Sequence, residues 1–183
     1  MASELRVDKI IPTGGVPTGG GGGVIQVVEE GTTTEAIITN TTASSPSQIF
    51  SATITPKFST SKIKIELNIF AYHENYHDGH IGLFKGSAST VITGASQGSY
   101  SDVSSIMLRQ GSFEDQSGDY QCNPTYYSYL DTAGTTSAIT YNIKGLTSNS
   151  SYPTYINRSL SRGQSNSNFP KLRSTLTLTE YSA

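Results

Sequence analysis

Charged residues are scarce in this chain, and several familiar features are missing altogether. Only 14% of the 183 residues are charged, and a net charge of -2 leaves no basic stripe of the kind that nucleic-acid binding needs. No apolar run approaches the ~18 residues of a membrane span. Residues 1–6 lack the basic-then-apolar layout of a secretory signal. We therefore expect no nucleic-acid partner, no membrane insertion and a protein made in a cytoplasm.

Residues for common site chemistry are equally few. The single cysteine, Cys122, excludes an intrachain disulfide framework. No Gly-Lys-Ser/Thr phosphate loop or Gly-x-Ser-x-Gly elbow is present, and the five glycines at 19–23 are followed by neither a helix nor a lysine. Glu66, Glu114 and Asp115 give no support for the carboxylate pair of a glycosidase. We expect no catalytic residue, no cofactor and no metal.

Changes in amino-acid composition divide the chain into three parts. Residues 1–18 open with a short amphipathic stretch, and residues 19–23 form a glycine hinge or a place of very close backbone approach. From residue 24 to residue 183 the chain is rich in Thr, Ile, Val and Tyr. Such side chains suit a pleated, half-buried surface, so this third part is predicted to be one β domain.

Alternation of apolar and polar residues is clearest at 62–71, which predicts a half-buried antiparallel strand. Phe70 falls on its second, polar face. The apolar face carries Ile63, Ile65, Leu67, Ile69 and Ala71. Further strands are expected at 24–28, 36–38, 48–56, 80–85, 104–109, 126–130, 138–144, 152–156 and 174–180. Eight to ten short strands with no helical period indicate an all-β, antiparallel jelly-roll sandwich.

Two parts of the chain resemble known proteins. Residues 3–10, followed by the Gly/Pro-rich stretch, resemble the N-terminus of many phage tail-fibre and virion structural proteins, in which such a strand docks onto the particle. The resemblance implies an extended anchor that binds tail, baseplate or capsid proteins. The residues that would carry this contact are Leu5, Arg6, Val7, Asp8, Ile10 and Ile11.

The body resembles the small C1q/TNF-like jelly-roll knob that closes many phage fibres. The shared stretches, in the same order, are residues 51–56, 61–65, 129–132, 135–141, 156–159 and 174–180. The resemblance implies a parallel homotrimer, and a sheet whose second face carries Phe70 and tyrosines would need such a cover. The residues we assign to trimer or core packing are Phe70, Tyr129, Tyr141, Leu176 and Leu178.

All three histidines of the chain fall within residues 72–80. Converging imidazoles and carboxylates bind zinc or nickel, but the preceding strand and Gly79 argue for a hairpin loop, on which this spacing fixes nothing. We favour a polar, aromatic loop that contacts a receptor or glycan, and metal binding is the weaker alternative. The residues concerned are Tyr72, His73, Tyr76, His77, Asp78 and His80.

Exposed tyrosines elsewhere could also stack on sugars. The candidates are Tyr100, Tyr120, Tyr126 and Tyr127.

The leading hypothesis is a virion structural protein, a short phage tail fibre or spike that presents a trimeric β knob for host attachment and receptor binding. It would be located in the virion. The alternatives are a capsid decoration or adaptor protein, a lectin-like carbohydrate-binding module, or, with least support, a polysaccharide depolymerase.

Overall fold

The computed structural model describes residues 23–73, 78–88, 92, 106–109, 123–158 and 172–182. Within them the chain forms ten β-strands and no helix, in antiparallel sheets, so the predicted all-β class is confirmed. The predicted anchor at 1–18 and the glycines up to residue 22 lie outside the described residues. The strands are β1 (Val24–Thr32), β2 (Ala36–Ile38), β3 (Ser47–Ile54), β4 (Lys62–His73), β5 (Asp78–Lys85), β6 (Ile106–Arg109), β7 (Asn123–Thr132), β8 (Ile139–Thr147), β9 (Thr154–Ile156) and β10 (Ser174–Tyr181).

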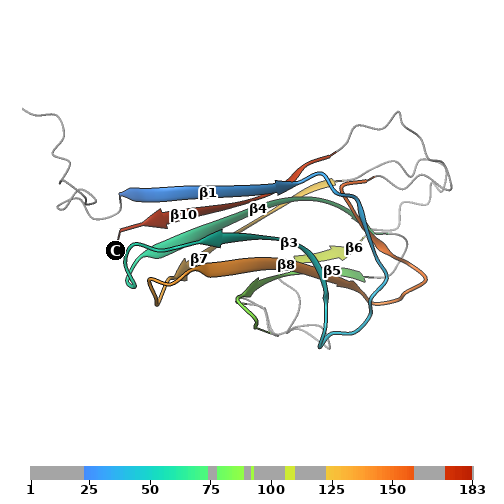
Figure 1. Cartoon of the computed structure of the whole chain (residues 1–183). Helices are drawn as coiled ribbons and strands as arrows, with labels where there is room; N and C mark the ends of the chain where they lie inside the picture. Colours follow the sequence, from blue (N-terminus) through green and yellow to red (C-terminus); the bar gives the residue numbers. More distant parts are fainter. Residues whose placement is uncertain are drawn as a thin grey trace, which may run out of the picture.

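One sheet, called sheet A, is built around the long strand β4 (Figure 1). β7 pairs with one edge of β4 along residues 62–71. The opposite edge pairs with β10 along residues 62–68 and then with β9 along residues 71–73. β1 and β2 pair in turn with β10 and β9. Sheet A therefore has four strand positions, and two of them are interrupted strands.

Asn157 bridges the break between β9 and β10. Its backbone adopts a positive φ of 57°, which asparagine tolerates better than most residues. The side-chain amide donates to the carbonyl oxygens of Thr32 and Thr34 at 2.9 and 3.1 Å, in the gap between β1 and β2. The Ser174 hydroxyl donates to Asn157 Oδ1 at 2.6 Å and accepts from the amide of Phe70 at 3.0 Å. These contacts satisfy the backbone groups that the interruption leaves without ladder partners.

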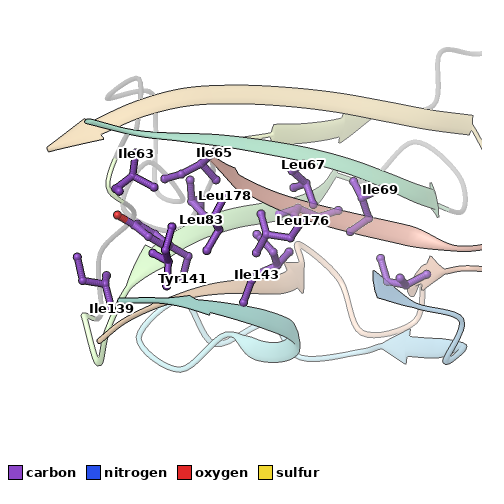
Figure 2. Close-up of a cluster of buried hydrophobic side chains, with 14 of the residues drawn as sticks. Ile63, Ile65, Leu67, Ile69, Leu83, Ile139, Tyr141, Ile143, Leu176 and Leu178 are labelled. Atoms are coloured by element: carbon purple, nitrogen blue, oxygen red, sulfur yellow. The ribbon is translucent and has the colours of Figure 1, made fainter. Parts of the chain in front are cut away.

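The second sheet, called sheet B, has the order β3-β8-β5-β6, with every pair antiparallel. The two sheets stack face to face and enclose one main core (Figure 2). Sheet A contributes the predicted apolar face of β4 together with Leu176 and Leu178. Sheet B contributes Leu83, Tyr141 and Ile143, all of them buried. The alternation predicted at 62–71 is thus confirmed, since Ile63, Ile65, Leu67, Ile69 and Ala71 are all buried.

The prediction of a hairpin between residues 73 and 80 is wrong. β4 belongs to sheet A and β5 to sheet B, so the chain crosses between the sheets there instead of turning back on itself. His73 is the last residue of β4, and Asp78 is the first residue of β5. Alternation within each strand was a sound guide, but it carries no information on which sheet the next strand joins.

The sandwich has two distinct ends. At the end called the terminal pole, β1 begins and β10 finishes, and the amide of Ser182 donates to the carbonyl of Gly23 at 3.0 Å. β4 also starts there, because Lys62 is the register partner of Tyr181. At the opposite end, called the loop pole, β4 finishes at His73 and β5 starts at Asp78 (Figure 1).

Candidate functional site

The loop pole holds most of the residues predicted to contact a receptor. Tyr72 and His73 end β4, and Asp78 and His80 lie at the start of β5. Tyr76 and His77 lie outside the described residues, as do Tyr100 and Tyr120. The structure therefore places four of the six predicted residues in strands at one end of the sandwich.

His73 and His80 face different layers. His73 follows the alternate residues of β4 that point to the buried face. Its Nδ1 lies 3.0 Å from the Thr154 hydroxyl. A Cβ on Gly79 would collide with that hydroxyl and press on the His73 ring, so the two sheets approach closely here. His80 has the parity of Phe84, on the far side of sheet B. Among the described residues, no group of three or more His, Cys, Asp or Glu could hold a metal ion.

Burial changes the titration of His80. Removal of its ring from water lowers the pKa of the imidazole, and the nearby Asp78 carboxylate opposes this only in part. A histidine with a lowered pKa is neutral at pH 7. His80 therefore adds no positive charge to the loop pole at pH 7.

Tyr72 is buried and does not offer an open ring to a ligand. It packs against Tyr155 with ring centroids 6.1 Å apart, on the outer face of sheet A. The Arg158 guanidinium lies 5.5 Å from the Tyr155 ring centre, within the range of a cation–π contact. Glu35 stands 4.0 Å from Arg158. This cluster stabilises the sheet where β2, β9 and β4 lie side by side.

Away from that cluster, the outer face of sheet A carries large apolar side chains in the open. Tyr126 is 61% exposed, Leu130 56% and Val27 57%. Tyr126 and Leu130 lie on β7, beside Asn68 and Lys64 of β4 in register. Val27 lies on β1, at the far edge of the same sheet. We call this surface the open face.

Two ion pairs lie on the open face. Lys64 Nζ lies 2.8 Å from Glu66 Oε1, and the Tyr126 hydroxyl donates to the same oxygen at 2.7 Å. The hydrogen bonds from Lys64 and Tyr126 lower the pKa of Glu66, and the bond to Glu66 raises the pKa of Lys64. Across the sheet, Arg173 pairs with Glu29 at 3.1 Å. The face therefore combines fixed aromatic and aliphatic groups with little net charge.

Part of the outer face of sheet B is covered instead. Phe84 and Leu146 point away from the main core, yet both are fully buried and form a small second core with Ala43. The Lys144 ammonium lies 4.7 Å from the centre of the Phe84 ring. Ala43 comes from the segment between β2 and β3, so the chain supplies its own cover on this side.

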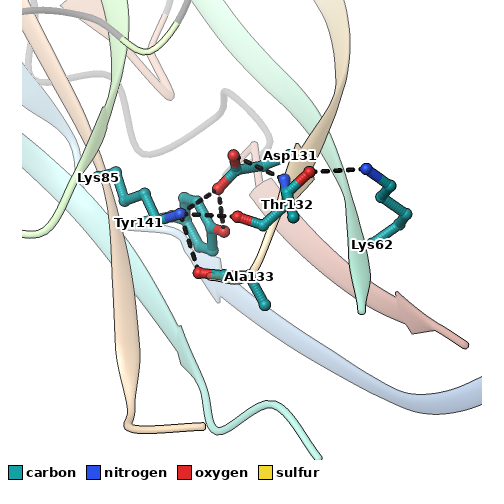
Figure 3. A network of polar contacts seen from close by, with 6 residues as sticks. All are labelled: Lys62, Lys85, Asp131, Thr132, Ala133 and Tyr141. Carbon is teal, nitrogen blue, oxygen red and sulfur yellow. Dashed lines mark hydrogen bonds and ion pairs between the residues drawn. The ribbon is translucent and has the colours of Figure 1, made fainter. Parts of the chain in front are cut away.

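An ion pair ties the two sheets together at the terminal pole (Figure 3). Lys85 of sheet B lies 2.7 Å from Asp131 of sheet A and also donates to the carbonyl oxygens of Thr132 and Ala133. The hydroxyl of the buried Tyr141 donates to the same carboxylate oxygen at 2.7 Å. Burial, together with this bond, raises the pKa of Tyr141 far above its usual range. This network joins the two sheets, and the Tyr141 phenol at its centre stays protonated.

A second buried carboxylate organises the neighbouring loop. Glu180 accepts from Gln26 Nε2 at 2.5 Å and from the amide of Lys57 at 2.8 Å. Burial of Glu180 works to raise the pKa of its carboxyl, but the polar hydrogens around it, including those of Gln26 and the backbone amides of Lys57 and Phe58, outweigh the burial, so the pKa of Glu180 is lowered. The carboxylate thus joins β1, β10 and the loop between β3 and β4.

These three charged residues were missed by the sequence analysis, although a signal for them exists. Each of the three residues lies at or next to the last position of its strand. Its side chain points to the same side of the strand as the core residues. Lys85 follows Ile81 and Leu83 at steps of two, and Glu180 follows Leu176 and Leu178. Asp131 follows Tyr127 and Tyr129 in the same way. A charged residue that continues an inward-facing series predicts a buried ion pair or hydrogen-bond network.

The residues assigned to trimer or core packing divide between the layers. Tyr141, Leu176 and Leu178 are buried in the main core, and Tyr129 packs against it while partly exposed. Phe70 is half-buried, with the parity of the open face. The anchor residues Leu5, Arg6, Val7, Asp8, Ile10 and Ile11 lie outside the described residues. Tyr127, one of the sugar-stacking candidates, packs against the main core, whereas Tyr126 is exposed.

No protein-family model matches this chain, and no curated protein matches it. In the described part of the chain, no helix is long and apolar enough to cross a membrane.

Proposed function

We propose that the protein is a virion structural protein of the phage tail-fibre or spike type. Residues 24–183 form its jelly-roll knob, and residues 1–18 attach that knob to the particle. Three copies assemble through the open face of sheet A, and the loop pole is directed at the host surface. The observation that carries the proposal is the nested pairing of the strands.

The nested pairing becomes clear when each interrupted strand is counted once. β1 with β2 is then the first of eight positions, and β10 with β9 is the last. The first position pairs with the eighth, the second (β3) with the seventh (β8), the third (β4) with the sixth (β7), and the fourth (β5) with the fifth (β6). This pattern supports a jelly roll, an architecture that viral capsid and lectin domains share.

The separation of the two poles supports the orientation. Gly23, which follows the predicted anchor and hinge, lies at the terminal pole beside Ser182. His73, Asp78 and His80 lie at the opposite end of the same sandwich. An anchor that precedes Gly23 holds the knob by its terminal pole, so the loop pole points away from the particle.

The open face supports self-association. Val27, Tyr126 and Leu130 expose large apolar side chains on one face of sheet A, and a surface with several such groups often marks an interface. Because Lys64 and Arg173 are already paired with acidic residues of the same face, a second copy meets it without unpaired like charges. A partner with a strong charge of one sign finds few unpaired opposite charges on this face. A second copy of the chain is therefore the occupant that the charges favour.

The first test is the mass of the full chain in solution by light scattering. One chain weighs 19.5 kDa, and we expect a mass near three chains. Leu130→Asp places a carboxylate on the open face and should give a monomer. Ser51→Asp places the same group on the exposed side of β3 in sheet B and should leave the mass unchanged. A monomeric parent, or a Leu130→Asp protein with the parent mass, contradicts the assembly.

A second test addresses the anchor. Deletion of residues 1–18 should leave a protein with the parent's circular dichroism and urea midpoint that no longer joins virus particles. Incorporation of the shortened protein at the parent level would overturn the attachment role.

A further inference from the structure

Phe58 is an exposed aromatic residue on a rigid loop at the terminal pole. It is 47% exposed and lies between β3 and β4. A single exposed apolar residue is ordinary on a protein surface and by itself indicates nothing. What sets Phe58 apart is the number of contacts that hold its backbone.

The loop is tied down on each side. The buried Glu180 carboxylate accepts from the backbone amide of Lys57, and its lowered pKa also reflects a bond from the amide of Phe58. The Phe58 carbonyl accepts from the amide of Ser61 at 3.2 Å. Next to it, the carbonyl oxygens of Ser59 and Ser61 accept from the amides of Gly134 and Ala133 at 2.8 and 2.9 Å. Phe58 is thus presented in one backbone conformation.

This arrangement combines two features that a simple stable fold avoids. Burying a carboxylate costs free energy unless several donors compensate it, and leaving an aromatic ring in water forgoes the gain of burying it. Here the buried charge orders a loop whose apolar side chain then points to solvent. Binding surfaces profit from such order, because a preordered aromatic residue loses little entropy when a partner covers it.

We propose that Phe58 inserts into an apolar pocket on the same virion protein that residues 1–18 bind, and so makes a second contact at the base of the knob. The inference rests on the proposed function. Only residues 19–23 separate the predicted anchor from β1, and five residues span at most roughly 18 Å when fully extended. A partner bound by residues 1–18 is therefore confined to the neighbourhood of the terminal pole, where Phe58 is displayed.

Charge on the same loop defines the pocket further. Lys57 and Lys62 flank Phe58 and are exposed, whereas Asp131 is paired with Lys85 and Glu180 is buried. The described surface around Phe58 is therefore cationic, and the matching pocket has an acidic rim. Once residues 1–18 are bound, the Phe58 contact forms at a high effective concentration, so a modest contact strengthens attachment considerably.

The experiment places a photo-crosslinking amino acid at position 7, 58 or 37 of the full chain, in cells that assemble the particle. Ile37 is the control, because it is 52% exposed but lies on β2, which pairs with β9 near the loop pole. We expect positions 7 and 58 to give adducts with the same virion protein and position 37 to give no adduct with that protein. An adduct at position 7 without one at 58, or an adduct of 58 with a second copy of this chain, overturns the inference. If position 7 itself gives no virion adduct, the proposed function fails, and this inference fails with it.

Matched substitutions give a second measurement. Phe58→Ser should leave the urea midpoint of the full chain unchanged but reduce its retention on particles after a high-salt wash by about tenfold, the loss expected for an aromatic anchor at an interface. Ile37→Ser should have no effect on retention. Equal retention of the two variants excludes a binding role for Phe58.

Discussion

The outer face of sheet B carries Phe84 and Leu146, which are fully buried, whereas the outer face of sheet A carries Tyr126 and Leu130, which are more than half exposed. Both pairs point away from the main core. On sheet B the chain supplies cover that includes Ala43, and on sheet A the described residues leave the surface open. The difference shows that an apolar residue on the outside of a sandwich can be covered within the chain or left in water, and we propose that the open residues contact another copy of the chain.

The largest expected effect distinguishes these two faces directly. Phe84→Ala should reduce the free energy of unfolding by ~3–5 kcal/mol, because it empties a closed second core. Tyr126→Ala should change it by less than ~0.5 kcal/mol, since that ring is already in water. Urea titration of both variants in the Leu130→Asp background keeps assembly out of the comparison. A small loss at Phe84 would mean that the cover on sheet B is not a real core.

A sharper comparison uses two carboxylates with similar partners. Asp131 accepts from Lys85 and Tyr141, and Glu66 accepts from Lys64 and Tyr126. Asp131→Ala leaves the buried Tyr141 hydroxyl without an acceptor and should cost ~1–3 kcal/mol of unfolding free energy. Glu66→Ala breaks contacts on an open surface and should cost no more than ~1 kcal/mol.

Urea midpoints measure both Ala variants, again in the monomeric background. If the two variants lose the same free energy of unfolding, the Lys85–Asp131–Tyr141 network stabilises the fold no more than a surface ion pair does.

The smallest expected effect is one of pH. The pKa of Glu180 is lowered in the folded chain from its ordinary value of 4.5. Its contribution to stability is therefore complete above that value and is lost as the pH falls through the lower, folded-state pKa. Glu180→Gln should weaken the acid dependence of the unfolding free energy below pH 4.5, measured by urea titration at several pH values.

Glu66→Gln is the control for the pH series, because the pKa of Glu66 is also lowered but its carboxylate lies at the surface. It should flatten the acid dependence less than Glu180→Gln. A greater flattening by Glu66→Gln would contradict the structural role assigned to Glu180.

Alternation along single strands was predictable from the sequence, because side-chain direction follows parity. Residues 62–71 therefore gave a correct buried face, and Phe70 a correct position on the second face. The sequence gives no comparable signal for the layer that covers an outer face. Phe84 follows Leu83 in one apolar run, and only the structure shows that the two rest in different cores.

The candidate site was less predictable than the fold. The spacing of His73 and His80 suggested a shared loop, but each lies in a strand of a different sheet, and this depends on long-range pairing. The breaks in two strand positions were also unpredictable, because they depend on Asn157 and Ser174 meeting across the sheet. Contacts of this kind join residues that no local pattern connects.

The pairing of β1 with β10 also determines how the sandwich resists force. The backbone hydrogen bonds of this antiparallel pair run perpendicular to the strands. Tension that enters at Gly23 and is resisted at the loop pole acts along the strands, so it loads these bonds together in shear. Tension applied between Gly23 and Ser182 would open them one after another, as in a zipper. In the proposed attachment, the sandwich is held by its N-terminal side and pulled from its far end, which is its mechanically stronger direction.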